Sequence, residues 1–371
     1  MKLLIVIDSL GGGGAERSTQ VLCEYLDKKG VSFEIVCLYF YPNGFHQEMI
    51  DKGYKITFLE KKSFFGQSME IGEIISKGKF DLVHSILFKS NLRTRFAKTF
   101  TRFTHLESLV NTTYSKERKF DNKVNQNLLA IYKMVDKYTA KVFVDHFHSI
   151  TNSVKNHYVE HLKINPKDIT VVYRGREKLE LDLDIRGKRD PNKFVLLNVA
   201  RQDYQKGQIF LLQAMKKLKE LGRTDIKLIN IGVEGSETAN LNRYVKDHNL
   251  NSTVEFAGFS NNVAEYFSIA DVFIFSSLFE GLGGALIEAQ SAGLPIITND
   301  IEVLREVVQK DLNGLLVNIK ETDQVVDAII RLRESPELRK NFEKESLKNY
   351  QNKFKQETSN RNMLELYKRL C

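Results

Sequence analysis

Two glutamates stand eight residues apart in the glycine-rich stretch 277–290, which reads SLFEGLGGALIEAQ. Glu280 falls on the turn made by residues 281–284, and Glu288 falls more than one helical turn further on. Glycines let a ligand approach the backbone, and the N–H groups that begin a helix attract an anion. The helix dipole alone explains one such carboxylate, at a few tenths to about 1 kcal/mol, but not both together with the glycines. The pattern suits a ligand with phosphates at its middle and hydroxyl-bearing sugars at either end.

A second loop carries two cations that could serve the same kind of ligand. Arg201 and Lys206 follow a strand expected over 194–199, and a helix follows them. Open α/β sheets bind ligands at the carboxyl ends of their strands, so both cations could converge on one anionic group. Cations on a surface loop are as often only solvated, and both alternatives stay open at this point.

A third loop, Gly11 to Gly14, follows the first expected strand and opens a helix. The dinucleotide fingerprint needs glycine at position 16 or 17, where this chain has Glu16 and Arg17, and no GxxxxGK[ST] fits. Dehydrogenases and P-loop NTPases are therefore disfavoured. The loop is either an anion site or a tight turn without a ligand.

The elements that must position these loops alternate between short apolar runs and segments of helical period. The clearest runs are 3–7, 33–38, 81–87, 194–199, 226–232 and 272–276. Continuous apolar strands indicate burial on both faces, and two such halves predict two doubly wound α/β domains. We expect an N-terminal domain over 1–178, a linker over 179–192, a C-terminal domain over 193–345 and a helical tail over 346–371 that packs back toward the N-terminal domain.

The three cysteines have no metal-ligand spacing, and His146 and His148 lack a third ligand nearby in sequence, so we expect no metal site. No apolar run approaches the length of a membrane span, and the opening residues lack the pattern of a cleaved signal. We expect a cytoplasmic protein, peripheral on the inner face of the membrane.

The formal charge of +8 lies entirely in the first 180 residues. Residues 89–103, KSNLRTRFAKTFTRF, have apolar residues at helical spacing with basic residues among them, and residues 61–65 add a basic, aromatic patch. Such a helix can lie on an anionic membrane surface, or can cover a sheet with its basic face in water. Nucleic acid is the competing partner, but it leaves the paired glutamates unexplained, so we expect none.

Several segments together resemble the retaining glycosyltransferases of family 4, which have the two-Rossmann GT-B architecture. The segments, which stand in the family's order and span essentially the whole chain, are GGGGAER, NSVKNHYVEHLKINPKDITVVYRG, VARQDYQKGQ, VEFAGF, FEGLGGALIEAQSAGLPIIT and EVVQKDLNGLLV. Each motif alone is weak or moderate, and their joint order is strong. The resemblance implies two Rossmann-like domains that face each other across a cleft.

The resemblance also implies roles for individual residues. Arg201 and Lys206 match the pair that neutralises the donor diphosphate, and Gly13 and Gly14 match the loop that closes over it. Glu280 matches the glutamate that faces the transferred sugar, so it joins the two cations as a catalytic residue. Glu288 matches the glutamate that binds the nucleotide ribose. The backbone beside the β-phosphate is that of Gly281, Leu282, Gly283 and Gly284.

Two positions depart from the family pattern. Many members have a histidine that touches the donor sugar where this chain has Val110 and Asn111, so Asn111 is the expected substitute. The segment VVYRGREK has Arg174 where relatives more often have asparagine, and Arg174 and Arg176 could alter the hinge or the acceptor side. His84 is either an acceptor-side residue or a buried, hydrogen-bonded one.

The resemblance implies a metal-independent, retaining glycosyltransferase that needs no cofactor. Its co-substrate would be a nucleotide-diphosphate sugar, most favourably a UDP-sugar, and it would transfer a hexose or N-acetylhexosamine. The acceptor would be a saccharide, expected to be lipid-linked and used in cell-surface polysaccharide assembly. The alternatives are a nucleotide-sugar epimerase or a phosphorylase of the same architecture, and a basic nucleic-acid-binding protein.

Overall fold

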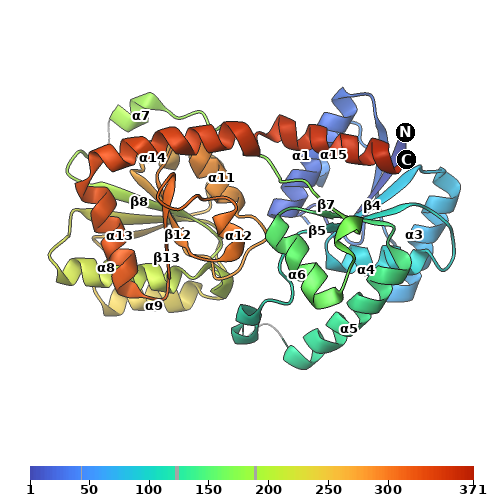
Figure 1. The fold of residues 1–371 in the computed structure, drawn as a ribbon, viewed down its shortest axis with the longest axis horizontal. Coiled ribbons are helices and arrows are strands. Elements are labelled where there is room, and N and C mark those ends of the chain that lie inside the picture. Colours follow the sequence, from blue (N-terminus) through green and yellow to red (C-terminus); the bar gives the residue numbers. More distant parts are fainter. Residues whose placement is uncertain (43, 122–124, 188–189) are drawn as a thin grey trace. The chain divides into compact units, whose positions relative to one another are not determined.

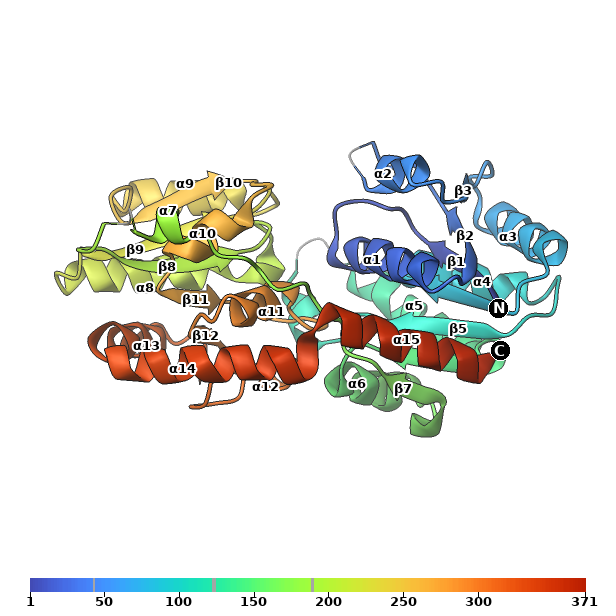
Figure 2. The same cartoon turned by 90° about the horizontal axis from the view of Figure 1, so that it is seen from above.

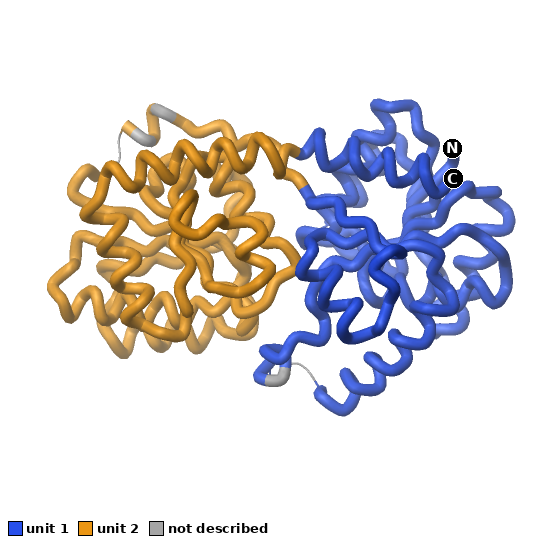
Figure 3. Tube along the Cα trace, in the orientation of Figure 1, with its two compact units in different colours: residues 1–174, 356–371 blue, residues 175–355 orange. Residues whose placement is uncertain are grey.

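The computed structural model describes residues 1–42, 44–121, 125–187 and 190–371, and it divides the chain into two compact units (Figure 3). Unit 1 comprises Met1–Arg174 and Gln356–Cys371, and unit 2 comprises Gly175–Lys355. Each unit is a parallel sheet with helices on both faces (Figures 1 and 2). The prediction of two doubly wound α/β domains is confirmed.

The segments at the predicted boundaries are held within the units. In the predicted linker 179–192, Leu179 N donates to Ser291 Oγ (3.1 Å) and Asp182 N donates to Ser268 Oγ (2.8 Å), so this stretch belongs to unit 2. Residues 188 and 189 lie outside the described residues. The predicted tail 346–371 is divided, with its last sixteen residues, 356–371, in unit 1. The segment was predicted as a linker because it is charged and has no apolar run. It is held to unit 2 by hydrogen bonds from its backbone, which do not require apolar residues in its sequence.

Unit 1 is built on a seven-stranded parallel sheet with the strand order β3-β2-β1-β4-β5-β6-β7. The central strands are buried on both faces, which explains their continuous apolar sequences. The strands are β1 (Lys2–Ile7), β2 (Ser32–Cys37), β3 (Ile56–Phe58), β4 (Leu82–Ile86), β5 (His105–Leu109), β6 (His146–Ser149) and β7 (Ile169–Val171).

The helices of unit 1 are α1 (Gly14–Lys28), α2 (His46–Asp51), α3 (Phe64–Gly78), α4 (Phe88–Ala97), α5 (Gln126–Phe143), α6 (Asn152–Leu162) and α15 (Gln356–Leu370). Alternate residues of β1 belong to two different cores. One core contains residues of α1 and α15, and the other contains residues of α3 and α4. The last helix of the chain therefore covers one face of the first sheet (Figure 1).

Unit 2 is built on a six-stranded sheet with the order β10-β9-β8-β11-β12-β13. Its strands are β8 (Phe194–Val199), β9 (Ile226–Ile231), β10 (Val254–Gly258), β11 (Val272–Phe275), β12 (Ile296–Asn299) and β13 (Gly314–Val317). Its helices are α7 (Leu183–Gly187), α8 (Gln208–Glu220), α9 (Thr238–Asp247), α10 (Val263–Ile269), α11 (Gly284–Ser291), α12 (Glu302–Arg305), α13 (Thr322–Glu334) and α14 (Pro336–Asn349). The main core packs α8, α9 and α13 against one face of this sheet.

The chain passes between the units twice, after Arg174 and after Lys355, and hydrogen bonds join the two passages. Arg176 N donates to Phe354 O (3.0 Å), and Tyr350 Oη donates to Arg176 O (3.0 Å). On the unit 1 side, Ser359 Oγ donates to Tyr173 O (2.5 Å). The two passages are therefore tied together on both sides of the boundary.

A chain of buried hydrogen bonds links α15 to the sheet of unit 1. Val172 O can only accept, so His148 Nε2 carries a proton and donates to it (3.0 Å). His148 Nδ1 then accepts from Ser108 Oγ (2.8 Å), and Ser108 Oγ accepts from His84 Nε2 (2.7 Å). His84 Nδ1 accepts from Tyr367 Oη (2.7 Å). Burial lowers the pKa of both histidines, so each ring is neutral near pH 7 and every hydrogen bond in the chain runs in the same direction.

This arrangement predicts that unit 1 loses stability in mild acid. Burial lowers the pKa of His148 to about 4, and it lowers the pKa of His84 well below its ordinary value. As the pH falls from about 6.5 to 4, the unfolded chain takes up a proton that folded His148 does not. The free energy of unfolding should therefore fall by about 1.4 kcal/mol per pH unit on account of this one side chain.

The measurement is urea unfolding at pH steps from 7 to 4.5, compared between the wild type and His148→Gln. The variant lacks the titrating group, so its stability should depend on pH less steeply by about that amount. Equal slopes for the two proteins would mean that His148 takes up its proton in the folded state as well.

Candidate active site

The predicted donor residues Arg201, Lys206 and Glu280 lie in the loops that follow two neighbouring strands of unit 2. In the order β10-β9-β8-β11-β12-β13, the chain leaves β8 toward one edge of the sheet and arrives at β11 on the other side. Open α/β sheets bind ligands at such a switch point, outside the carboxyl ends of the strands. The loop after β8 carries Arg201 and Lys206, and the loop after β11 carries Glu280.

Hydrogen bonds join these two loops into one structure. Leu278 N donates to Gln205 O (2.8 Å), and Gln205 Nε2 donates back to Phe279 O (2.7 Å). Ser276 Oγ donates to Lys206 O (2.7 Å). The position of Lys206 relative to the glutamate loop is therefore fixed by the backbone of both loops.

Gly207 is required by this close approach, a role that was not predicted from the sequence. Its φ is +60°, and a Cβ built on it would lie 2.4 Å from Ser276 O. Any other residue would be strained and would also push the two loops apart.

Lys206 and Glu280 are brought together at the centre of this structure. Lys206 Nζ forms an ion pair with Glu280 Oε1, which also accepts from Ser277 Oγ (3.0 Å). Glu280 is buried and Lys206 is partly buried. The sequence placed both residues at the donor, and the structure places them in contact with each other.

Arg201 lies differently from its predicted partner. Its side chain is 60% exposed, and its Nε is 3.1 Å from Asp203 Oδ2 within the same loop. The structure therefore brings Lys206 to Glu280, while Arg201 stays paired in solvent at the end of β8.

The start of α11 completes this part of the site. Gly283 has a φ of +84° and directly precedes the helix, so no side chain of that residue caps the N–H groups. The guanidinium of Arg176 lies against this end, because a Cβ on Gly284 would be 2.5 Å from Arg176 Nη2. Arg176 Nε is also 3.4 Å from Glu288 Oε1, and both side chains are only 12% exposed.

Arg176 is therefore the residue whose position the sequence did not foresee. It was expected at the hinge or on the acceptor side, and its backbone does belong to the first passage between the units. Its side chain instead lies beside Glu288 in unit 2, where a cation would adjoin the predicted ribose and phosphate contacts. Spacing along the chain gives no sign of this contact, since the two residues are more than a hundred positions apart.

In unit 1 the predicted glycine loop follows β1, which neighbours β4 at the switch point of that sheet. Gly13 directly precedes α1, and a Cβ on it would be 2.4 Å from Glu16 Oε2. The carboxylate of Glu16 thus lies at the helix start where an anion was expected. Gly14 is the first residue of α1, and Asn111 Oδ1 accepts from Thr112 N (2.8 Å) in the loop after β5.

Two further residues mark the switch point of unit 1 and were not singled out from the sequence. Asp8 Oδ1 accepts from both Ser90 N (2.8 Å) and Ser90 Oγ (2.6 Å), which fixes the first turn of α4 from the end of β1. Leu87 directly precedes α4 with φ +77° and ψ 153°, a conformation that is normally reserved for glycine. Strain of this kind concentrates at functional sites.

The sequence left two roles open for His84, an acceptor-side residue or a buried, hydrogen-bonded one, and the structure shows the second. It is buried, and both of its ring nitrogens are bound to Tyr367 and Ser108. Within the described ranges, no group of three or more His, Cys, Asp or Glu side chains is arranged to hold a metal ion. In the same ranges no helix combines the length and the apolar character needed to cross a bilayer.

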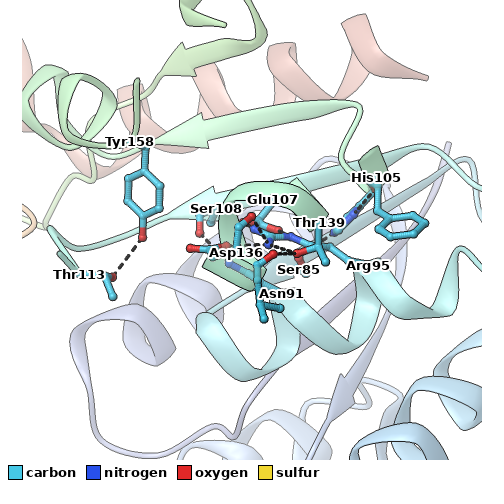
Figure 4. A network of polar contacts seen from close by, with 12 residues as sticks. Ser85, Asn91, Arg95, His105, Glu107, Ser108, Thr113, Asp136, Thr139 and Tyr158 are labelled. Atoms are coloured by element: carbon cyan, nitrogen blue, oxygen red, sulfur yellow. Dashed lines mark hydrogen bonds and ion pairs between the residues drawn. The ribbon is translucent and has the colours of Figure 1, made fainter. Parts of the chain in front are cut away.

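A buried ionic network lies on the other face of the unit 1 sheet (Figure 4). Arg95 of α4 donates to both carboxylate oxygens of Glu107 on β5, at 2.7 and 2.5 Å. Its Nη1 donates to Asp136 Oδ1 (2.6 Å) and Thr139 Oγ1 (2.9 Å), both on α5. Tyr114 Oη donates to the second oxygen of Asp136 (2.5 Å). Burial lowers the pKa of Arg95, but the two carboxylates outweigh it and raise the pKa overall.

This network bears on the two alternatives that the sequence left open for residues 89–103, a membrane-surface helix or a helix that covers the sheet. The helix α4 ends at Ala97, Leu92 is buried in the core, and Arg95 is 1% exposed. The alternative, a sheet-covering helix, is the correct interpretation for α4. The sequence did not show that Arg95 is buried, because its partners are 12 and 41 positions further along the chain.

Both halves of the chain match sequence models of glycosyltransferases. Residues 12–177 match the model described as Glycosyltransferase Family 4, and residues 182–349 match Glycosyl transferases group 1. The chain is 27% identical over 318 residues to the Staphylococcus aureus capsular polysaccharide biosynthesis glycosyltransferase CapH, covering 83% of this chain and 84% of that one.

A second relative comes from Campylobacter jejuni and is 28% identical over 367 residues, covering 92% of both chains. It is the N-acetylgalactosamine-N,N'-diacetylbacillosaminyl-diphospho-undecaprenol 4-alpha-N-acetylgalactosaminyltransferase. Among solved structures, Anabaena Alr3699/HepE in complex with UDP-glucose has a TM-score of 0.84 at 18% identity, with 99% of both chains covered.

Two Rossmann-like units with loops gathered at their switch points, together with these matches, define a glycosyltransferase of the GT-B fold. The chain belongs to the glycosyltransferases that these two models describe together, family 4 over its first half and group 1 over its second.

Proposed function

We propose that this glycosyltransferase transfers a hexose or N-acetylhexosamine from a UDP-sugar, with retention of the anomeric configuration and without a metal ion. The acceptor is a lipid-linked saccharide used in cell-surface polysaccharide assembly. The observation that carries the proposal is the contact between Lys206 and Glu280 beside the uncapped start of α11. This arrangement offers a cation and the N–H groups of a helix start without a side-chain cap to a diphosphate, next to a carboxylate for the sugar.

Each donor group has a proposed partner in unit 2. Lys206 and Arg201 neutralise the diphosphate, and the backbone of residues 281–284 donates to the β-phosphate. Glu280 faces the transferred sugar, and Glu288 accepts hydrogen bonds from the ribose hydroxyls. The structural neighbour that binds UDP-glucose supports the choice of a uridine nucleotide. In unit 1, Gly13 and Gly14 close over the diphosphate and Asn111 is the sugar-side residue.

The chemistry follows from where charge develops. Breaking the bond between the sugar and the diphosphate leaves negative charge on the leaving group and oxocarbenium character on the sugar. Lys206 and the α11 N–H groups stabilise the leaving diphosphate, because oriented donors need no reorganisation as the charge forms. The carboxylate of Glu280 stabilises the positive sugar from close range. The acceptor hydroxyl attacks on the face that the diphosphate leaves, and its proton passes to the departing phosphate oxygen as the sugar–phosphate bond breaks. Glu280 therefore acts by positioning and electrostatics and forms no covalent intermediate.

The acceptor side is proposed from charge and from the relatives. The excess charge of +8 lies in the first 180 residues, most of them in unit 1, which suits a diphosphate-bearing acceptor at the inner membrane face. The Campylobacter relative acts on a diphospho-undecaprenol saccharide, and the Staphylococcus relative acts in capsular polysaccharide biosynthesis.

The test is a panel of UDP-, GDP- and ADP-sugars incubated with extracts of lipid-linked saccharides. We expect nucleotide release from one UDP-sugar only, at a rate that rises with the concentration of the acceptor. The glycosidic bond of the product should keep the anomeric configuration of the donor. An inverted product would overturn the mechanism, and release that requires a divalent metal would overturn metal independence. A product formed without any acceptor would indicate an epimerase instead.

A further inference from the structure

The helix α5 exposes a continuous apolar face on unit 1, where Figure 1 shows it along the margin of that unit. Tyr138 is 66% exposed and Val142 is 70% exposed, although a helix of a doubly wound domain normally buries its apolar side. The exposed apolar residues of the helix are Leu128, Ile131, Tyr132, Met134, Tyr138 and Val142. They cover nearly half of the helix circumference, as an interfacial helix does.

A row of lysines flanks this apolar face. Lys133, Lys137 and Lys141 recur every fourth residue, each one directly before Met134, Tyr138 or Val142. Lys141 is exposed and Lys137 is partly exposed, whereas Lys133 Nζ lies 3.3 Å from His161 Nδ1. Asp136 is the only acidic residue in the sequence of α5, and it is buried against Arg95. The exposed surface of the helix therefore combines apolar and aromatic side chains with positive charge and no acidic side chain of its own.

We propose that α5 is the surface by which unit 1 docks on an anionic membrane, lying in the headgroup region with Tyr138 and Val142 in the acyl boundary. Apolar burial together with attraction between lysines and anionic lipids is the physical basis of such binding. A second copy of the chain is disfavoured as the occupant, because two such faces would bring lysines together with no acidic partner on α5. A bilayer offers acyl chains to the apolar residues and anionic headgroups to the lysines of the surface.

The placement of α5 suits a role in capturing an acceptor. Tyr132, on the exposed face, contacts the ring of Phe88 with centroids 5.6 Å apart, and Phe88 begins α4 at the carboxyl end of β4. The Arg95 network holds the other side of α5 to the sheet. The docked helix would therefore keep the switch-point loops of unit 1 close to the headgroups. This use of the surface rests on the proposed lipid-linked acceptor, whereas membrane binding itself does not.

The test is flotation of the full chain with vesicles of phosphatidylcholine alone or with 30% phosphatidylglycerol, without nucleotide or acceptor. We expect binding to the anionic vesicles that is at least tenfold stronger and weakens with salt. Ile131→Gln/Met134→Gln/Tyr138→Gln should lower this binding at least tenfold while keeping the helical circular dichroism. Lys137→Gln/Lys141→Gln should lower it about fivefold per lysine.

The matched control is Phe65→Gln/Phe100→Gln, which removes one exposed aromatic residue from the basic patch 61–65 and one from the basic segment 89–103. This control should bind as the wild type does. Equal binding of the α5 triple variant and the wild type would overturn the proposal, and so would loss of binding in the control alone. Self-association of the wild type that the triple variant abolishes would assign the face to a second copy instead. Because no sugar donor is present, these outcomes do not depend on the proposed reaction.

Discussion

Glu288→Ala is expected to weaken UDP binding roughly ten- to a hundredfold, whereas Glu280→Ala should leave UDP affinity nearly unchanged and lower kcat by about 10²–10³. The first figure is the usual loss of about 1.5–3 kcal/mol when a hydrogen bond to a charged group is removed. The second is the usual effect of removing one group that stabilises charge in the transition state. The difference arises because Glu288 is proposed to hold the ribose in every bound state, and Glu280 to act only as the sugar becomes cationic.

The measurements are titration calorimetry with UDP and initial rates with the donor sugar that the panel identifies. Both carboxylates are paired in the structure, Glu280 with Lys206 and Glu288 with Arg176, so each variant also frees a cation. Glu280→Gln and Arg176→Leu are the controls, because the first keeps the shape of the side chain and the second leaves Glu288 without this partner. Equal losses of UDP affinity in the two alanine variants would contradict the division of roles.

Arg95→Leu is expected to lower the free energy of unfolding by about 3–5 kcal/mol. The substitution leaves Glu107 and Asp136 buried next to each other without their cation, and an uncompensated buried charge is strongly destabilising. Denaturant unfolding measures the loss, with Arg102→Leu as an exposed control on the same segment that should change stability by less than about 0.5 kcal/mol.

A further variant separates lost charge compensation from lost packing. Arg95→Leu/Glu107→Gln/Asp136→Asn removes all three charges, so it should recover part of the stability lost in Arg95→Leu. The triple variant could instead be less stable than Arg95→Leu by the sum of the losses that Glu107→Gln and Asp136→Asn each cause alone. In that case the network contributes through its hydrogen bonds and not through charge compensation.

The sequence was most informative where physical patterns are local. Continuous apolar runs predicted both parallel sheets, since strands buried on two faces need no alternation. The glycine turn and its two carboxylates lie within one short stretch, and Lys206 was found because it follows a strand. These local patterns predict the donor loops without any knowledge of the contacts between them.

What the sequence did not give are contacts between residues far apart in the chain. The side chain of Arg176 lies beside Glu288, and Arg95 lies between two carboxylates. A sequence does not show whether a basic residue is exposed to water or buried in a core. The apolar residues of α5 were missed for the related reason that helical spacing describes a face without saying what covers it. Leu87 was missed because backbone strain in a residue other than glycine leaves no sequence pattern.

The position of α15 has a consequence for how the protein is made. Tyr367 bonds to His84 across 283 residues, and Met363, Leu364 and Leu366 belong to the first sheet's core. Unit 2 is continuous in sequence, so it can fold as soon as it leaves the ribosome. Unit 1 cannot finish until the last helix has been synthesised and released. Unit 1, whose strands are translated before unit 2, is therefore completed last, and one apolar face of its sheet stays uncovered until α15 is available.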